Sequence, residues 1–304
     1  QKRAPEAEAA LKRSIAIDER LYGPQAPRLA SSLNNLGLGY RNEGDDIRAA
    51  PLFERSLAID ERRYGGDHPT LVINLSNLGA SYRELQRLDD AQQMLERSLA
   101  IGEQRLSATH PDMVYPVRNL GLLYQERGNA VEAERFLQRA LAIREANLSP
   151  QDPDLAISLH DLAMLHLAGG RFNQSKDFIN RALKIDETAF GPAHPEVATD
   201  LGVLAQIEEA QFHLPEAHTY QERIVTIYQN TYGASSYEAA SAQVSLARLL
   251  RKEGRVDEAE SLYREALDPL EKEVKRDPRG VTRCLFGLAQ VYRQQKRWQP
   301  AEEA

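Results

Sequence analysis

The chain has 304 residues, of which 42% are hydrophobic, and its 38 Lys and Arg against 45 Asp and Glu give a net charge of −7. This charge argues against a nucleic-acid binder held by overall basicity, so no nucleic-acid partner is expected. No apolar run approaches the ~18 residues of a membrane span, so no membrane partner is expected. The single cysteine, Cys284, excludes an internal disulfide and a multi-cysteine zinc site.

The two ends of the sequence favour a piece of a longer protein. The sequence begins at Gln1 without an initiator methionine or a visible signal peptide, and it stops at Ala304 in the middle of a repeating pattern. We therefore expect a fragment, located in the cytoplasm.

A period of 42 residues runs along the chain, and three markers define it. The first marker is a proline, found at Pro27, Pro69, Pro111, Pro153 and Pro195. The second is Leu-Gly or Leu-Ala, at Leu36, Leu78, Leu120, Leu162, Leu204, Leu246 and Leu288. The third is a small residue that opens a second segment, at Ala49, Ala91, Ala133, Ser175, Ala217, Ala259 and Ala301. The markers predict a single array over 1–304, with a partial repeat at 1–23, six full pairs at 24–275 and a truncated repeat at 276–304.

Each repeat is predicted to contain two helices. Leu29, Leu33 and Tyr40 share one face of the first segment, and the second segment, from Asp46 to Tyr64, carries one apolar stripe as well. Prolines mark helix starts, and glycines such as Gly65 mark helix ends. No strand pattern is present. Since one pair cannot bury both stripes alone, the pairs should stack into an all-α solenoid.

Two prolines depart from this pattern. Pro116 and Pro269 fall inside predicted helices, at least four residues past their starts. A proline in a helix interior removes one hydrogen bond and costs ~3 kcal/mol. We predict a kink or local unwinding at both positions.

The repeat resembles the tetratricopeptide repeat in its 42-residue form, which is typical of kinesin light chains. The residues that carry this resemblance are Leu33-Asn34-Asn35-Leu36-Gly37 with Arg55-Ser56-Leu57-Ala58-Ile59, and Asn119-Leu120-Gly121 with Arg139-Ala140-Leu141-Ala142-Ile143. The resemblance covers essentially the whole chain. It implies a right-handed superhelix of antiparallel helix pairs, whose first helices line a concave, peptide-binding surface.

The face of the first helices that points away from the local core is the candidate binding groove. Its members are Asn34, Asn35, Leu38, Arg41, Asn77, Arg83, Arg118, Asn119, Leu122, His160, Asp161 and Met164. Asparagine amides can pair with the main chain of an extended peptide, arginines favour an acidic ligand, and leucine or methionine supplies apolar pockets. The alternatives are that the asparagines bond the neighbouring helix and that the arginines form an ordinary solvated face.

Other chemistry is not expected. His68, His110 and His194 recur once per repeat, on the order of 10 Å or more apart, so one metal ion cannot bridge them and they should belong to structural turns. His160, Asp161 and His166 diverge around their helix, and Cys284 should be a packed thiol. The charged runs 60–63 and 271–276 should lie on the solvated outer face. We expect no cofactor, no metal and no catalytic residue, hence not an enzyme.

The sequence therefore predicts a non-catalytic scaffold that binds a peptide or partner protein in its concave groove. The alternative is a sensor or regulatory arm of a multidomain signalling enzyme, such as an ATPase, a protease or a kinase, whose catalytic part lies outside these residues. A third hypothesis is self-association through an uncapped end that exposes Leu285, Leu288 and Val291.

Overall fold

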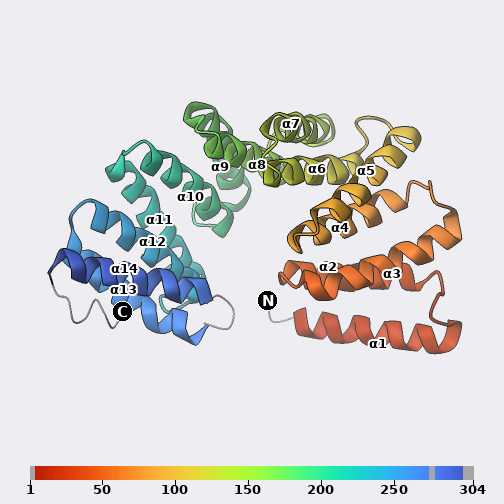
Figure 1. Ribbon diagram of the computed structural model, residues 1–304, viewed down its shortest axis with the longest axis horizontal. Coiled ribbons are helices and arrows are strands. Elements are labelled where there is room, and N and C mark those ends of the chain that lie inside the picture. The colour runs from red at the N-terminus through yellow and green to blue at the C-terminus, as the bar shows by residue number, and fades with distance from the viewer. Residues whose placement is uncertain (1–3, 274–277, 297–304) are drawn as a thin grey trace. The chain divides into compact units, whose positions relative to one another are not determined.

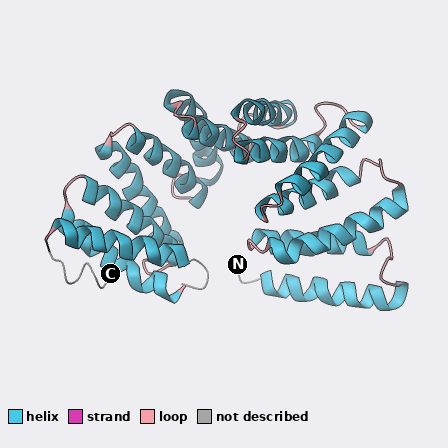
Figure 2. Cartoon of the chain, in the orientation of Figure 1, coloured by secondary structure: helices cyan, strands magenta, loops and turns pink. Residues whose placement is uncertain are grey.

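The structure is a computed structural model that describes residues 4–273 and 278–296. Those residues contain α-helices, one 3-10 turn and no β-strand, as Figure 2 shows. None of the described helices is long and apolar enough to cross a membrane. The helices are α1 (Ala4–Tyr22), α2 (Leu29–Asn42), α3 (Asp46–Tyr64), α4 (Leu71–Glu84), α5 (Leu88–Arg105), α6 (Val114–Glu126), α7 (Ala130–Asn147), α8 (Pro153–Ala168), α9 (Phe172–Phe190), α10 (Pro195–Ala210), α11 (Leu214–Tyr232), α12 (Tyr237–Lys252), α13 (Val256–Lys272) and α14 (Pro278–Gln294).

The chain divides into two compact units, Gln1–Pro150 and Gln151–Ala304, and the boundary falls between two repeats. Within each unit the first helices from α2 to α12 each pack on the second helix that follows, antiparallel to it (Figure 1). In the described residues a second-type helix, α1, is followed by six helix pairs and then by a first-type helix, α14. The predicted last second-type helix lies outside the described residues. That both units form one array stays a prediction.

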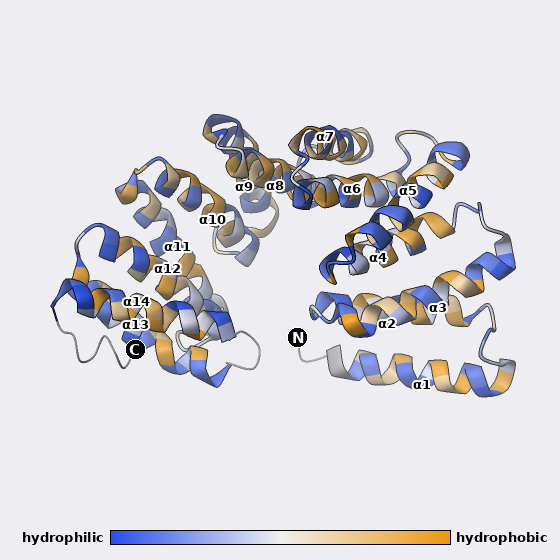
Figure 3. Ribbon diagram, viewed as in Figure 1, coloured by the Kyte–Doolittle hydropathy of each residue, from blue (hydrophilic) through white to orange (hydrophobic). Residues whose placement is uncertain are grey.

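The helix boundaries follow from capping residues, as α3 illustrates. Asp45 precedes the helix, and its side chain accepts a hydrogen bond from the backbone N–H of Arg48 at 3.0 Å. At the other end Gly65 takes φ +89°, a conformation that glycine adopts without steric cost. Its N–H donates to the carbonyl of Glu61 at 2.9 Å. Polar and apolar residues share each helix in Figure 3, and the apolar ones form the cores of the two units.

The recurrent histidines cap helix starts, which confirms their predicted role in structural turns. The Nδ1 atom of His110 accepts from the backbone N–H of Asp112 at 3.2 Å, and that of His194 accepts from Glu196 at 3.3 Å. A cap of this kind contributes ~1 kcal/mol. Other capping side chains take the same repeat position before α8 and α12: Asp152 and Ser236.

The two unusual prolines behave differently from each other. The turn Pro111–Met113 is a 3-10 turn and α6 begins only at Val114, so Pro116 lies in the first turn of the helix, where its missing N–H costs little. The prediction that Pro116 lies at least four residues past a helix start is therefore wrong, and residue 116 itself is helical. In contrast, α13 continues through Pro269 to its end at Lys272. No unwinding occurs at Pro269, and a kink there stays a prediction.

The Leu-Gly marker allows the two helices of a repeat to approach closely. A Cβ atom built on Gly79 of α4 would lie 2.7 Å from the Leu95 side chain and 3.2 Å from the carbonyl of Ala91, both on α5. The equivalent glycines face equally close neighbours: Gly37 against Phe53, and Gly121 against Leu137. The small residue at this position therefore sets the distance between the paired helices.

We expect Gly79→Ala to lower the free energy of unfolding by about 1–3 kcal/mol, because the added methyl group overpacks the contact with α5. Gly39 on α2 is the matched control, since a Cβ there meets nothing within 4 Å. Gly39→Ala should raise stability by about 0.5–1 kcal/mol through helix propensity. Urea unfolding followed by circular dichroism measures both, and equal shifts of the two variants would contradict the packing argument.

The turn inside each repeat requires a left-handed residue. Glycine fills this position in four repeats, at Gly44, Gly128, Gly170 and Gly254, all with positive φ. In other repeats the residue is not glycine, and Gln86 and Phe212 still adopt φ of 59° and 62°. A left-handed residue with a side chain costs roughly 1–2 kcal/mol. The packing of the two helices therefore imposes a left-handed turn residue even where its side chain disfavours that backbone conformation.

Phe212→Gly should raise the free energy of unfolding by about 0.5–1 kcal/mol, because it relieves this conformation. The Phe212 side chain is 87% exposed, so its removal costs little packing. Phe212→Ala separates the two effects, since it removes the ring but keeps the strained backbone. Thermal and urea unfolding of both variants test this, and a gain of the same size for alanine would refute the explanation.

Neighbouring repeats within a unit are joined by ion pairs between successive second helices. Arg97 on α5 reaches Glu61 on α3 at 2.5 Å and also donates to the carbonyl of Gly66 in the connecting turn at 2.7 Å. Equivalent pairs recur in both units: Arg55 with Glu19 and Arg139 with Glu103 in unit 1, and Arg223 with Glu187 in unit 2. The arginine of the Arg-Ser-Leu-Ala-Ile motif is thus a contact between repeats. Such half-exposed pairs fix geometry more than they add stability.

Two predictions about surface residues need correction. Asp60, expected on the solvated face, is buried and accepts a hydrogen bond from Asn74 at 2.6 Å. Leu288 and Val291, expected to expose an apolar end, are buried in unit 2. These two residues therefore offer no surface for self-association. In the second charged run, residues 271–273 are exposed as predicted, and residues 274–276 lie outside the described part.

Candidate functional site

A groove of about 630 Å³ lies in unit 1 between α2, α3 and α4. Asn34 and Asn35 of α2 line it, together with Tyr64 at the end of α3 and Ile73 of α4. His110 from the turn before α6 completes one side. Two of the predicted groove asparagines therefore line a real depression of the surface.

The predicted groove asparagines of unit 1 differ in what they contact. The side-chain amide of Asn77 on α4 donates to Oδ1 of Asn34 on α2 at 3.0 Å, and its Oδ1 accepts from Arg41 at 3.4 Å. Asn77 and Asn119 are each only 7% exposed, whereas Asn35 is exposed. Asn77 thus connects neighbouring first helices, as the alternative hypothesis held, while Asn35 faces the groove.

The three predicted arginines come together on unit 1, and none of them lines the groove. Burial lowers the pKa of Arg41, the Asp46 carboxylate opposes this, and the nearby positive charges of Arg83 and Arg118 lower the pKa further. Acidic neighbours accompany the cluster: Arg83 pairs with Glu84, and its Nε lies 3.5 Å from Glu126. Because the protein supplies its own carboxylates here, the case for an acidic ligand at these arginines is weaker than the sequence suggested.

The remaining predicted residues are divided between the units. Leu38 and Leu122 of unit 1 are half-buried, and Leu38 packs against the hydrophobic core. The other three belong to α8 of unit 2, where Asp161 is buried and His160 and Met164 are half-buried. The twelve predicted residues are thus divided between the two units, and that they form one site stays a prediction.

A second groove, also of about 630 Å³, lies in unit 2 between α10, α11 and α12. It occupies the same repeat positions four repeats later: Asn34 corresponds to Gly202, and Tyr64 corresponds to Tyr232. Its lining was missed because Gly202 and Val203 stand here at the repeat positions of Asn34 and Asn35. The 42-residue period could have found it, since Tyr232 repeats the position of Tyr64.

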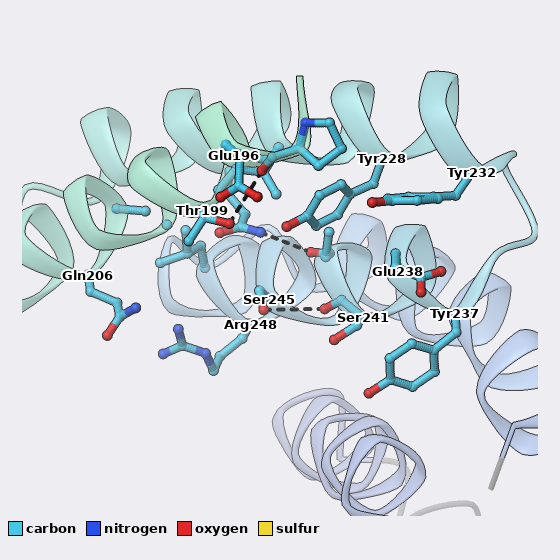
Figure 4. A pocket seen from close by; sticks show the side chains of 18 of the residues that line it. Glu196, Thr199, Gln206, Tyr228, Tyr232, Tyr237, Glu238, Ser241, Ser245 and Arg248 are labelled. Atoms are coloured by element: carbon cyan, nitrogen blue, oxygen red, sulfur yellow. Dashed lines mark hydrogen bonds between the residues drawn. The ribbon is translucent and has the colours of Figure 1, made fainter. Parts of the chain in front are cut away.

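Three tyrosines gather at one end of this second groove, which Figure 4 shows from close by. The rings of Tyr228 and Tyr232 on α11 lie 5.9 Å apart with an interplanar angle of 52°, and Tyr237 begins α12 across the groove. Burial raises the pKa of Tyr228, and the carboxylates of Glu196 and Glu238 contribute in the same direction. The tyrosines and two carboxylates therefore form one cluster.

A buried carboxyl pair lies deeper in unit 2. Burial raises the pKa of Asp186 to about 7, and the negative charges of Asp200 and Glu196 add to this. His160 contacts the other side of Asp200, with Nδ1 3.3 Å from Oδ1. The equivalent positions of an earlier repeat hold an Asp–Asn pair, Asp60 and Asn74. The repeat in unit 2 has thus replaced a neutral hydrogen-bond donor with a second acid.

Asp186→Asn should stabilise the protein at high pH. A carboxyl whose folded pKa exceeds its unfolded value supports the fold below that unfolded value, here 3.8, and loses this contribution as pH rises through about 7. The variant should therefore match the native chain near pH 4 and exceed it by about 1–2 kcal/mol above pH 7. Urea midpoints measured across this range test the prediction.

Asp177→Asn provides the control, because Asp177 is an exposed residue of the same helix, α9. It makes the same change in net charge without touching the buried pair. If both variants follow the pH dependence of the native chain in parallel, the buried pair is not its cause.

The described residues hold no cluster of three or more His, Cys, Asp or Glu with the arrangement of a metal site. Cys284 is buried, its Sγ donates to the carbonyl of Tyr263 at 3.1 Å, and burial raises its pKa to about 12. Its predicted role as a packed thiol is confirmed. What remains as a candidate site is the pair of grooves.

The fold and grooves define an α-helical repeat protein. The family model of the tetratricopeptide repeat matches residues 1–62, 39–104, 115–188, 170–230 and 238–304. The chain belongs to the tetratricopeptide repeat family, as its sequence resemblance predicted. No curated protein matches it in sequence.

Solved structures place it beside kinesin-light-chain-like proteins. It is similar to BtubC (BKLC) from P. vanneervenii, with 26% identity and a TM-score of 0.62 over 71% of this chain and 87% of that one. A kinesin-light-chain-like protein of Podosopora anserina with nearly identical TPR-like repeats gives 24% identity and a TM-score of 0.56 over 68% and 98%. A Rap protein complexed with Competence and Sporulation Factor shares the fold at 16% identity, with a TM-score of 0.61 over 91% and 74%.

Proposed function

We propose that this chain is a non-catalytic scaffold that binds an extended peptide, or an extended segment of a partner protein, along the exposed face of its first helices. The observation that carries the proposal is the recurrence of one groove. Two grooves of about 630 Å³ occupy equivalent repeat positions in the two units, each bordered by two first helices and the intervening second helix. A volume of this size suits a few side chains of a peptide.

The family supports a binding role. Tetratricopeptide repeats are an interaction architecture, and the Rap protein of the same fold was solved in complex with Competence and Sporulation Factor. Fold alone does not name a ligand, so the chemistry must come from the residues in the grooves.

In unit 1 the groove residues are suited to hydrogen bonding with the main chain of a bound peptide. Asn35 is exposed on α2 and lines the groove, and its amide offers both a donor and an acceptor. An amide that pairs with peptide backbone makes little demand on ligand sequence. Tyr64 and Ile73 add apolar surface on either side.

Asn35→Ala should weaken peptide binding about three- to tenfold without changing the melting temperature, because it removes one or two hydrogen bonds to the ligand. The probes are peptides selected from a phage-displayed random library on the full chain and measured by fluorescence polarisation. Asn42→Ala is the matched control, since Asn42 is exposed on the same helix but lies outside the groove lining.

Asn77→Ala should have the opposite profile: a lower melting temperature, because the contact between α2 and α4 is lost, with a smaller effect on the affinity of the remaining folded protein. Selected peptides that bind Asn35→Ala as tightly as the native chain would overturn the proposed function.

A further inference from the structure

We propose that Asp186, Asp200 and His160 form a pH-sensitive contact that holds α10 against α8 and α9 at acidic pH and loosens α10, together with the wall of the unit 2 groove, as the pH rises to neutrality. The loosening of α10 needs no ligand, and only its effect on binding rests on the proposed function. The three residues are called the acid contact below.

The side chains of the acid contact come from three successive helices and meet inside unit 2. Nδ1 of His160 on α8 lies 3.3 Å from Oδ1 of Asp200 on α10, and Asp200 is only 2% exposed. Among the described residues, no amide, hydroxyl or cationic nitrogen donates to Oδ2 of Asp200, which is buried. The carboxyl group of Asp186 on α9, 6% exposed, shares a hydrogen bond with Asp200. The contact thus joins α8, α9 and α10.

A hydrogen bond between two carboxyl groups requires a proton on one of them. Since Asp200 already faces the ring nitrogen of His160, Asp186 is the group that keeps the proton and donates it to Asp200. When this proton is lost, two carboxylates lie against each other in a buried place, where their repulsion is weakly screened. The contact that joined α9 to α10 then separates them.

The charged groups around Asp186 strengthen this effect. Asp200 and Glu196 face it from α10, and His160 faces it from α8. His160 is the one group of these three that can carry a positive charge. His194, at the start of α10, directs its Nδ1 to the backbone N–H of Glu196 as a helix cap. Burial raises the pKa of Asp186 to about 7, and the charges of Asp200 and Glu196 add to this.

The equivalent contact in unit 1 lacks these properties. Asn74 stands at the repeat position of Asp200, and its amide donates to Asp60 at 2.6 Å, so no carboxyl group has to keep a proton. Burial raises the pKa of Asp60, while the amide of Asn74 and the positive charge of Arg63 oppose the rise. Unit 2 carries Ala189 at the repeat position of Arg63. The acid contact is therefore a local feature of unit 2 and not a property of the repeat.

The helix α10 carries both the acid contact and one wall of the groove. Thr199 directly precedes Asp200 and lines the groove, as do Gly202 two residues later and Glu196 four residues earlier. Figure 4 shows Glu196 and Thr199 beside Tyr228 of α11. Because α10 packs on α9, a change in that packing moves the groove wall as well.

The direction of the effect follows from the pKa of Asp186. Its ordinary value is 3.8, and its value in the packed contact is about 7. The stabilisation is therefore complete below 3.8, is lost as the pH rises through about 7, and changes no further above that. Helix α10 should be held more firmly near pH 5 than near pH 7.5.

The first test is hydrogen exchange of the full chain, followed by mass spectrometry at about pH 5 and about pH 7.5 and corrected for the intrinsic exchange rates. The amides of α10 should be protected about tenfold less at the higher pH. Helix α4 of unit 1, which carries Asn74, is the internal reference and should change less than about twofold. Equal protection of α10 at both pH values would overturn the inference.

Asp200→Asn gives unit 2 the pair found in unit 1, because its amide can donate to Asp186 while its oxygen still faces His160. The protection of α10 should then be the same at both pH values. Asp177→Asn is the matched control, since Asp177 is exposed on α9 and the change in charge is equal. It should keep the response of the native chain. If Asp200→Asn keeps that response too, or Asp177→Asn abolishes it, the acid contact is not its cause.

The effect on binding is tested with the library-selected peptides whose affinity falls in Tyr232→Ala, because Tyr232 lines the unit 2 groove. Their affinity for the native chain should fall about three- to tenfold from about pH 5 to about pH 7.5. Their affinity for Asp200→Asn should stay constant, which corrects for titration of the peptides themselves. A fall of equal size in both proteins would overturn the link between the acid contact and the groove, and would leave the proposed function in place.

Discussion

The close approach of two helices at a small residue is the constraint on which this structure depends. A Cβ atom on Gly79 would overlap Leu95, and the same contact recurs at Gly37 and Gly121. Where the later repeats carry alanine, as at Ala163 and Ala247, the residue is fully buried at the same position. With the pairs held at this distance, each repeat presents one apolar surface to the next, and burial of that surface is the main source of stability.

The interactions between repeats then fix the orientation of one pair on the next. The arginine–glutamate pairs join successive second helices, as Arg97 and Glu61 do, and the side chain of Asn77 joins two first helices. Capping by His110 and His194 sets where the next first helix begins. Because these contacts leave one face of the first helices exposed, grooves of the same size form at equivalent positions in both units.

With the arrangement of the helices fixed within a unit, substitutions at the groove positions change the chemistry of the groove without changing its size. An exposed asparagine and one tyrosine line the groove of unit 1, while three tyrosines line that of unit 2 together with Glu196 and Glu238. The buried acid pair of Asp186 and Asp200 arises in the same way, since an earlier repeat places Asn74 where unit 2 places an acid. The repeats thus keep the residues that contact neighbouring helices and vary the residues that line the grooves.

The sequence by itself determined the all-α fold, the order of the helices and most of their caps, because these follow from a period and from local backbone chemistry. The span 46–64 and the place of His110 and His194 in structural turns could be predicted. The candidate site could be predicted only in part, because side-chain partners depend on the packing of neighbouring repeats. Only the tertiary structure decided that Asn77 is used internally while Asn35 faces a groove, that carboxylates lie beside Arg83, and that Tyr228 and Glu238 line the same groove.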